Sequence, residues 1–586
     1  MAREAVEAQF QTHDGEPLFY RYWPATQEPA QGAVLLFHRG HEHSGRVAHL
    51  VDELDLPRHA FFAWDARGHG RSPGERGYSP SLATSVRDIQ TFADHIAVTH
   101  GIAADRMAVV AQSVGAVLAA AWVHDYAPPI RCLVLASPAF KVKLYVPLAR
   151  PGLRLMQKLR GKFFINSYVK AKFLTHDPQR IESYRKDPLI TRAIAANILL
   201  DLYDTAERIV ADAGAITVPT QLLISGADWV VHRKPQEQFF ERLGTRAKER
   251  MVLDGFYHDT LGERDRANAV AAARRFITRE FESPSAPVSL LRADQEGFFK
   301  DEADRLAAPL PLLSPAGLYW GLTRAALKLG GALSEGVRLG HETGFDSGST
   351  LDYVYRNQAA GRLGIGKFFD RRYLDAIGWR GIRQRKLNVE ELIGQAVHRL
   401  RAAGREVRIV DIAAGHGRYV LEGLARLGGP PVQGILLRDY SDLNVAQGQA
   451  LIRAMGLEAI ARFEKGDAFN GDDLAALQPR PTLGIVSGLY ELFGDNAMVG
   501  RSLQGLAQAM TPGSYLIYTG QPWHPQLEFI ARALTSHRAG AAWVMRRRSQ
   551  AEMDELVRAA GFEKVTQRMD DWGIFTVSLA RRMSRS

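Results

Sequence analysis

The chain of 586 residues has a single cysteine, Cys132, so no disulfide can form within it. Structural disulfides belong mainly to oxidising compartments, and their exclusion favours a cytoplasmic location. The first residues lack the apolar core of a signal peptide, and no apolar run is long and charge-free enough to span a bilayer. We therefore expect a cytoplasmic protein. A peripheral contact with the inner membrane surface stays open.

The sequence also lacks an extreme composition, since its apolar and charged fractions are those of ordinary globular proteins. The formal net charge of +10 permits an anionic partner without requiring one. Residues 141–172 carry many Lys and Arg, no Asp or Glu, and interleaved apolar residues. That mixture suits an anionic membrane or an acidic substrate, and equally a solvated basic surface. We expect no nucleic-acid partner and no metal.

The length exceeds what one hydrophobic core usually holds, which predicts two domains. A rhythm of buried strands and helices breaks at about 140–218, where an amphipathic helical stretch predicts a cap inserted over a sheet. The Pro- and Ser-rich stretch Ser283–Pro287 marks a boundary. The prediction is an α/β domain with a helical cap, a helical connection and a second α/β domain, over residues 1–284, 285–345 and 346–586.

The first domain is organised around Ser113. The apolar run Met107–Ala111 predicts a buried strand, and the small residues Ala111 and Gly115 on either side of Ser113 permit a sharp strand-to-helix turn. Such a turn exposes a serine oxygen above the sheet, beside the positive end of the following helix. The pattern alone is weak, because a serine that caps a helix has the same neighbours.

Two later residues strengthen this interpretation. Asp228 follows the predicted strand 220–224, and His258 follows the predicted strand 250–253. The chain order of serine, acid and histidine is that of the hydrolase fold. A serine hydroxyl needs a neutral imidazole to take its proton, and a carboxylate to orient that imidazole. The order therefore predicts a triad of Ser113, Asp228 and His258.

The motifs His38–Arg46, Asp65–Ser72 and the Ser113 turn, with Thr175–Pro178 and Tyr184–Leu189, resemble the monoacylglycerol lipase and lysophospholipase branch of the α/β-hydrolases. The resemblance covers roughly residues 8–282. It implies a glycerolipid or lysophospholipid ester as substrate, with an acyl-enzyme at the serine. By the same resemblance, the backbone N–H groups of Gly40 and Val114 form the oxyanion hole. The sequence departs from the lipase pattern at Arg39 and His41, where the lipases usually have glycines.

The second domain opens with a strand and a glycine turn, Arg408–Gly417, and a helix follows. Glycines at a helix N-terminus let a ligand approach the backbone. Asp439 ends the next predicted strand, roughly 20 to 25 residues after the glycines, and an acid at this separation can bind ribose hydroxyls. A nicotinamide dinucleotide needs a third glycine, which Arg418, Tyr419 and Val420 replace.

This set resembles a Rossmann-like class I S-adenosylmethionine-dependent methyltransferase. The resemblance implies S-adenosylmethionine as cofactor, with a first motif at the turn, a ribose-binding acid and an adenine-binding pair. A fold of this kind that has lost its cofactor stays open as the alternative. The first motif is Asp411, Ala413, Gly415 and Gly417; the acid is Asp439, and the pair is Asp467 and Ala468.

Three further stretches, Gly344–Asn357, Ile377–Lys386 and Thr519–Gln526, resemble a bacterial family that fuses a lipase-like hydrolase to a methyltransferase. The methyl acceptor is less readable. His524, with Tyr490 and Glu491, could flank the transferred methyl as a general base, or be a turn histidine between prolines. Arg546–Arg548 could pair with a phosphate or be solvated.

The sequence therefore predicts a bifunctional enzyme: a serine ester hydrolase of a lipid and a methyltransferase, with a lipid-related acceptor as one candidate. One rival is an active hydrolase with a cofactor-dead second domain. Another is a non-catalytic lipid-binding protein at the membrane surface. The sequence leaves the acyl chain, the acceptor and the oligomeric state open.

Overall fold

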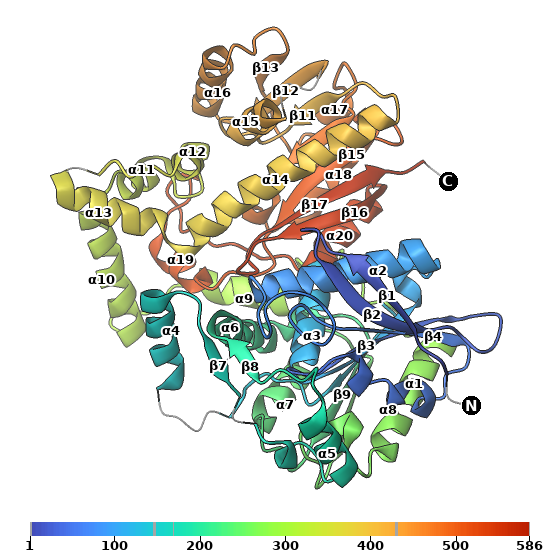
Figure 1. The fold of residues 1–586 in the computed structure, drawn as a ribbon. Helices are drawn as coiled ribbons and strands as arrows, with labels where there is room; N and C mark the ends of the chain where they lie inside the picture. The colour runs from blue at the N-terminus through green and yellow to red at the C-terminus, as the bar shows by residue number, and fades with distance from the viewer. Residues whose placement is uncertain (1–2, 144–147, 168, 362, 428–431, 585–586) are drawn as a thin grey trace. The chain divides into compact units, whose positions relative to one another are not determined.

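The computed structural model forms two compact units, Met1–Val288 and Ser289–Ser586 (Figure 1). Within the described ranges, no helix combines the length and apolar character that crossing a bilayer requires. The residues described are 3–143, 148–167, 169–361, 363–427 and 432–584.

An eight-stranded sheet forms the middle of the first unit, with the strand order β1-β2-β4-β3-β5-β6-β9-β10. The strand β2 runs antiparallel to both of its neighbours, and all other neighbouring pairs are parallel. The central strands are buried at every position, as strands covered by helices on both faces should be. In sheet order the strands are β1 (Val6–Gln11), β2 (Pro17–Trp23), β4 (His59–Trp64), β3 (Gly32–Phe37), β5 (Met107–Gln112), β6 (Cys132–Ala136), β9 (Thr220–Ser225) and β10 (Lys248–Leu253).

Helices cover both faces of this sheet. On one face α1 and α8 share a core with the central strands. The helix α3 is buried around most of its circumference, because it packs between the sheet and the helices α2 and α6. This placement brings the start of α3 to the carboxyl end of β5. The helices are α1 (His49–Glu53), α2 (Leu82–His100), α3 (Val114–Tyr126), α6 (Ala196–Ala211), α7 (Arg233–Arg242) and α8 (Ala267–Glu282).

The predicted cap region at 140–218 contains α4 (Ala149–Arg160), α5 (Pro178–Lys186) and α6, and also a two-stranded sheet that the sequence did not predict. That sheet pairs β7 (Phe164–Asn166) with β8 (Ala193–Ala195). Strands of three residues are too short to give a periodic signal. Part of the basic stretch at 141–172, residues 144–147 and 168, lies outside the described residues. Within α4, Arg150 and Arg154 pair with acids of α6.

The second unit is built on a seven-stranded sheet with the order β13-β12-β11-β14-β15-β17-β16. The strands are parallel except β17, which runs antiparallel to both neighbours. The chain direction across the sheet reverses between β11 and β14, and open α/β sheets bind ligands at the carboxyl ends of such strands. The strands are β11 (Arg408–Asp411), β12 (Gly434–Asp439), β13 (Ala461–Lys465), β14 (Leu483–Val486), β15 (Tyr515–Gly520), β16 (Phe562–Met569) and β17 (Thr576–Arg582).

Two apolar cores lie on opposite faces of this sheet. The long helix α14 runs along one face with α15 and α16, while α17, α18 and α20 cover the other (Figure 1). These layers confirm the predicted Rossmann-like α/β fold. The helices are α14 (Ile377–Ala402), α15 (Arg418–Arg426), α16 (Asp442–Ala454), α17 (Gly471–Ala475), α18 (Asn496–Ala509) and α20 (Gln550–Ala559).

A helical cluster precedes this sheet in the chain. It includes most of the stretch 285–345, and its apolar residues join those of α19 in one further core. The expected helix near residue 318 is α10, which begins with Ser314 accepting from the Gly317 N–H and with Pro315 at the first position. The helices are α9 (Phe298–Ala307), α10 (Pro315–Gly330), α11 (Glu335–Thr343), α12 (Gly348–Arg356), α13 (Leu363–Leu374) and α19 (Leu527–Ala533).

Candidate active sites

The turn between β5 and α3 places Ser113 as the sequence predicts. Ser113 has φ 56° and ψ −116°, a backbone conformation that non-glycine residues rarely adopt. Two hydrogen bonds hold it: its N–H donates to Ala136 O at 3.0 Å, and its carbonyl accepts from the Ala139 N–H at 3.1 Å. Gly115 is required here, because an added Cβ would lie 2.4 Å from His38 O. The strain is stored in a turn that leaves the serine oxygen free to bond a side chain.

Three side chains far apart in the chain meet at this turn. Ser113 Oγ lies 2.7 Å from His258 Nε2, and His258 Nδ1 lies 2.7 Å from Asp228 Oδ2. A carboxylate only accepts, so Nδ1 carries the hydrogen and Nε2 offers its lone pair to the serine hydroxyl. All three residues are at most 9 % exposed. The arrangement can take a proton from Ser113 as its oxygen attacks a carbonyl carbon.

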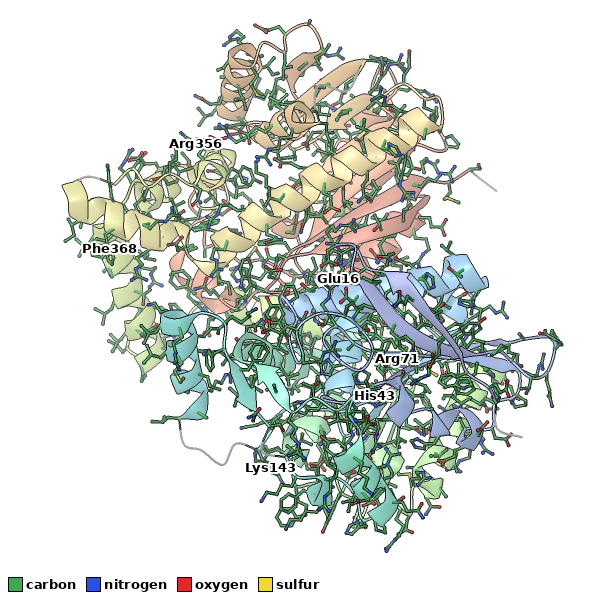
Figure 2. All side chains as sticks on the ribbon, viewed as in Figure 1. Glu16, His43, Arg71, Lys143, Arg356 and Phe368 are labelled. Atoms are coloured by element: carbon green, nitrogen blue, oxygen red, sulfur yellow. The ribbon has the colours of Figure 1, made fainter. Side chains whose placement is uncertain are left out.

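The carboxylate of Asp228 is fixed from several sides. Burial raises its pKa, but His258 and the N–H groups of Val230 and Val231 outweigh burial and hold the pKa below its ordinary value. Those N–H groups donate to Oδ1 at 2.7 and 2.9 Å. Lys143, labelled in Figure 2, donates from Nζ to the Asp228 carbonyl at 2.6 Å. Asp228 is therefore ionised and oriented before any substrate binds.

Gly40 and Val114 lie next to each other beside Ser113. A Cβ added to Gly40 would lie 3.1 Å from Val114 Cγ2. The Val114 N–H belongs to the first turn of α3, where N–H groups have no partner within a helix. The two predicted oxyanion residues are thus brought together at a helix N-terminus, where negative charge is stabilised.

The structure assigns a role to Arg39, which the sequence identified only as a departure from the lipase pattern. Its guanidinium donates to both carboxylate oxygens of Glu42, at 2.6 and 3.0 Å, and lies 3.5 Å from Asp259 Oδ2. Asp259 also accepts from Gln112 Nε2 at 2.9 Å. Arg39 is buried and links the loop of Gly40 to the residue after His258. No local pattern could reveal a pair separated by so much of the chain.

We expect Arg39→Met to lower the free energy of unfolding of the first unit by about 3 kcal/mol, because it leaves the buried Glu42 carboxylate without its hydrogen-bonded cation and Asp259 with Arg180 alone. Denaturant unfolding of the full chain measures this. The control is Arg71→Met, since Arg71 forms an exposed pair with Glu7, and a change below about 1 kcal/mol is expected there. Equal losses in both variants would contradict the role given to Arg39.

The glycine turn of the second unit follows β11 as predicted. Gly415 and Gly417 have φ of 58° and 76°, which favours glycine, and a Cβ on Gly417 would lie 2.4 Å from Leu437 Cδ1. The Gly415 N–H donates to Asp439 Oδ2 at 3.0 Å. Asp439 Oδ1 accepts from the Ser441 N–H and from Asn444 Nδ2. The turn and the acid at the end of β12 therefore form one unit.

Asp411 lies beneath this turn. It is fully buried, and it accepts from Tyr419 Oη at 2.5 Å and from the Ala413 N–H at 3.2 Å. Burial raises its pKa to about 7, although these two hydrogen bonds favour the charged form. In this structure Asp411 supports the turn from below.

A raised carboxyl pKa stabilises the fold below the unfolded value near 3.8, and that stability is lost as the pH rises through 7. Hydrogen exchange, corrected for the intrinsic exchange rate at each pH, gives the free energy of opening of β11. We expect this free energy to have a pH-dependent component that makes it lower at pH 8 than at pH 5 by about 3 kcal/mol. Asp411→Asn should remove that component. Asp472→Asn, at an exposed position of α17, is the control and should keep it. An unchanged pH dependence in Asp411→Asn would contradict the prediction.

The predicted adenine-binding pair follows β13. The Gly466 N–H donates to the Asp439 carbonyl at 3.0 Å, which ties this loop to the end of β12. Asp467 is exposed and accepts from the Phe469 N–H at 2.8 Å, while Ala468 is buried. The carboxylate of Asp439, the two glycines and this loop lie along one edge of the sheet. The residues present fit a nucleoside ligand with two ribose hydroxyls.

The residues suggested for the acceptor side divide into two groups. Glu491 and His524 line a cavity of about 590 Å³, whereas Tyr490 Oη donates to Ser502 Oγ inside the core. His524 Nδ1 accepts from the Gln526 N–H at 3.0 Å, and burial lowers the pKa of His524 to about 3. The general-base interpretation of His524 is therefore wrong: Nδ1 is occupied, so a neutral ring carries its hydrogen on Nε2.

The interpretation of the three consecutive arginines as solvated is also wrong, whereas the phosphate interpretation stays a prediction. Arg546, Arg547 and Arg548 are each at most 7 % exposed. Their guanidinium groups bond Glu552, Glu302 and backbone carbonyls, so internal partners rather than bulk water hold them.

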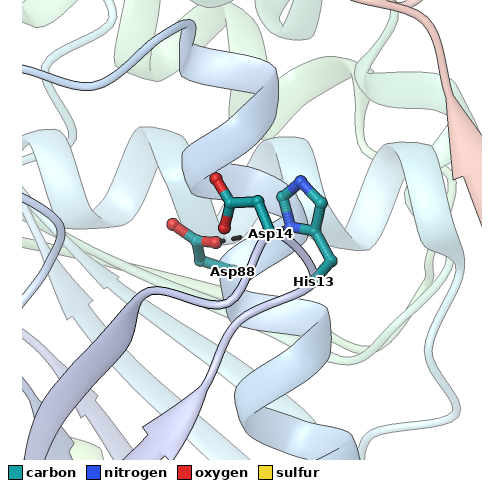
Figure 3. Close-up of side chains that lie close together, drawn as sticks. All are labelled: His13, Asp14 and Asp88. Atoms are coloured by element: carbon teal, nitrogen blue, oxygen red, sulfur yellow. Dashed lines mark ion pairs between the residues drawn. The ribbon is translucent and has the colours of Figure 1, made fainter.

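Among the described residues, one group of ligand-type side chains has its donor atoms within 4.8 Å of one another: His13, Asp14 and Asp88 (Figure 3). Arg67 donates to the carboxylates of Asp14 and Asp88 at 2.8 to 2.9 Å. The Arg67 guanidinium thus already pairs with both acids, and the cluster is an ion-pair network.

Comparison with known proteins gives two matches within the one chain. Residues 28–265 match the family described as "Serine aminopeptidase, S33", and residues 273–582 match the family described as "Putative methyltransferase". The chain is 61 % identical to the Escherichia coli (strain K12) "Uncharacterized protein YnbC" over 574 residues, which is 98 % of each chain.

The first half alone is similar to lipases. It is 26 % identical to a monoacylglycerol lipase of Mycolicibacterium smegmatis over 42 % of this chain and 88 % of that protein. It is 27 % identical to the human monoglyceride lipase, over 42 % and 80 %. The crystal structure of Paleococcus ferrophilus monoacylglycerol lipase covers 47 % of this chain and 99 % of its own, with 24 % identity and a TM-score of 0.40. The chain therefore belongs to the family described as "Putative methyltransferase", and it carries an α/β-hydrolase domain of the S33 type in the same polypeptide.

Proposed function

We propose that the first unit is a serine hydrolase of glycerolipid esters, such as a monoacylglycerol or a lysophospholipid. The observation that carries this is the Ser113–His258–Asp228 chain, with both hydrogen bonds at 2.7 Å. In this mechanism Ser113 Oγ attacks the ester carbonyl carbon while His258 takes its proton. The Gly40 and Val114 N–H groups stabilise the oxyanion. The proton then passes to the leaving alcohol, and water hydrolyses the acyl-enzyme. Similarity to monoglyceride lipases supports the substrate class.

We further propose that the second unit transfers a methyl group from S-adenosylmethionine. Its membership of the methyltransferase family and the turn that joins Gly415 to Asp439 support this. When bound, the cofactor would supply a methyl group on a positively charged sulfur. Asp439 would hold the ribose hydroxyls, Asp467 and Ala468 the adenine, and the N–H groups of the glycine turn would face the ligand. Asp411 would support that turn.

A peripheral membrane contact is a further part of this proposal. The helix α4 exposes Leu155 and Leu159 beside Lys158 and Arg160, the mixture that binds an anionic lipid surface. A lipid hydrolase needs access to such a surface. The exposed apolar positions support this contact at the first unit.

Both activities are tested together by incubating the protein with a bacterial lipid extract and S-adenosylmethionine that carries a deuterated methyl group. Mass spectrometry should find free fatty acid and a deuterated product. Fatty acid without any deuterated species would remove the transferase from the proposal, and a deuterated species without fatty acid would remove the hydrolase.

A further inference from the structure

The second unit contains a cavity of about 590 Å³. It lies at the carboxyl ends of β14 and β15, which are followed by Glu491 and by Gln521 and His524. Its other walls come mainly from α10, α11, α12, α13, α14 and α19. None of the predicted cofactor residues lines it. Since β14 pairs with β11, the cavity lies beside the glycine turn, at the end of the sheet where ligands bind.

The walls of this cavity are mainly apolar. Its volume is in the range of sites that bind whole small molecules rather than single ions or waters. The walls therefore select a ligand with a large hydrocarbon or aromatic body. Buried apolar side chains on the walls include Val337, Phe345, Trp379, Ile382, Leu534 and Phe575.

Four polar atoms of buried side chains on the walls have no hydrogen-bond partner among the described residues, and a fifth such atom, Tyr373 Oη, belongs to a partly exposed side chain. Three are donors: Arg385 Nε, Gln521 Nε2 and Trp543 Nε1. The fourth is an acceptor, Glu491 Oε2. Each of these four residues is at most 9 % exposed. Because an unpaired buried polar group destabilises a fold, a group of four at one cavity points to a polar ligand atom that pairs with them.

The surroundings of Glu491 leave one oxygen for a ligand. Thr519 Oγ1 donates to Oε1 at 2.6 Å and accepts from the Gly488 N–H at 2.8 Å. The Arg385 guanidinium lies 3.7 Å from the same Oε1 and balances the charge of the carboxylate. Oε2 is therefore the free acceptor. The Glu491 carboxylate and the Arg385 guanidinium together add no net charge to the cavity.

We propose that this cavity binds the methyl acceptor of the second unit, and that the acceptor is a hydroxyl compound with a large apolar body. A hydroxyl donates one hydrogen bond, to Glu491 Oε2, and accepts from Arg385 or Gln521. An alkylammonium ion has donors only and would face the three donors of the walls, and a carboxylate would have no hydrogen for Glu491. This inference rests on the proposed transferase function and names its substrate class.

The step balances with the sulfonium methyl donor of that function. The hydroxyl oxygen attacks the methyl carbon, so a C–O bond forms and the C–S bond breaks. The bonding electron pair passes to sulfur, which leaves as a neutral thioether. The hydroxyl proton passes to Glu491 Oε2, which acts as the general base. The product is a methyl ether.

Binding is measured by calorimetry with decan-1-ol and two matched probes, 1-methoxydecane and decylamine, using the full chain. We expect decan-1-ol to bind at least ten-fold more tightly than either, because only it satisfies both the donors and Glu491. Equal binding of all three would overturn the assignment of a hydroxyl, and no binding by decan-1-ol would overturn the site.

Two glycines of α10 give matched variants. A Cβ on either Gly330 or Gly321 meets no heavy atom within 4 Å, but only Gly330 lines the cavity. Gly330→Phe should weaken decan-1-ol binding at least ten-fold, and Gly321→Phe should leave it unchanged. Equal effects in the two variants would place the ligand elsewhere.

The role of Glu491 is tested with deuterated-methyl S-adenosylmethionine and decan-1-ol. Wild type should form deuterated 1-methoxydecane, while Glu491→Gln should bind the alcohol and form at least 100-fold less ether. Alcohol that binds without any ether, in a protein that calorimetry shows to bind S-adenosylmethionine, would overturn the acceptor assignment. A wild type that does not bind S-adenosylmethionine would instead overturn the transferase function.

Discussion

Ser113→Ala is expected to lower kcat/KM for hydrolysis of 1-oleoylglycerol roughly 10⁴-fold or more, with the unfolding free energy almost unchanged. The variant keeps the Cβ but removes the oxygen that lies 2.7 Å from His258 Nε2. Removing a catalytic nucleophile costs four to six orders of magnitude in comparable hydrolases. Fatty acid release, followed by mass spectrometry, measures the effect.

The matched control is Ser81→Ala, a serine that caps α2 through its hydroxyl. It should cost about 1 kcal/mol of stability and leave hydrolysis unchanged. Hydrolysis that survives in Ser113→Ala at more than a hundredth of the wild-type rate would show that another group attacks the ester.

Asp439→Ala is expected to weaken binding of S-adenosylmethionine roughly 10- to 100-fold. Hydrogen bonds to a charged group contribute about 1.5–3 kcal/mol each, and ten-fold in affinity corresponds to about 1.4 kcal/mol. The carboxylate also holds the Gly415 N–H, so its loss loosens the turn. Calorimetry with the full chain measures the dissociation constant.

Asp442→Ala is the control for this measurement. Asp442 lies three residues further along the chain, and its side chain is exposed and pairs with Lys465. It should leave the dissociation constant within two-fold of wild type. If both variants bind like wild type, the ribose lies elsewhere; if neither wild type nor control binds, the domain is cofactor-dead.

The central strands of both sheets could be predicted, because they are buried on both faces and appear as unbroken apolar runs. The edge strand β1 and its neighbour β2 gave no such signal, since β1 is largely exposed and partly exposed residues interrupt the buried positions of β2. The two-stranded sheet of the cap was missed for a related reason: its stability comes from pairing across the cap, which no local pattern records.

The residues of the hydrolase site could be predicted because each triad member follows a strand in the expected order. What the sequence could not supply was the support around them. Arg39 acquires its role from Asp259, a residue more than two hundred positions away. The cavity of the second unit is assembled from residues between Thr323 and Phe575, so no window of sequence contains it.

Tertiary contacts also bear on two local interpretations that the sequence left open. Arg546–Arg548 looks like a solvated or phosphate-binding cluster, yet tertiary packing buries it against Glu552 and Glu302. His524 is a residue type that often acts as a base, but the Gln526 N–H occupies its Nδ1. A local sequence pattern gives the chemical type of a side chain, and its neighbours in space decide what that side chain can do.

The central claim, an activated serine in the first unit, is tested most directly by fluorophosphonate labelling followed by peptide mass spectrometry. The account predicts one adduct, on Ser113, that forms more slowly when 1-oleoylglycerol is present and at least 100-fold more slowly in His258→Ala. No adduct on the folded wild-type protein, or an adduct on a different residue, would contradict it.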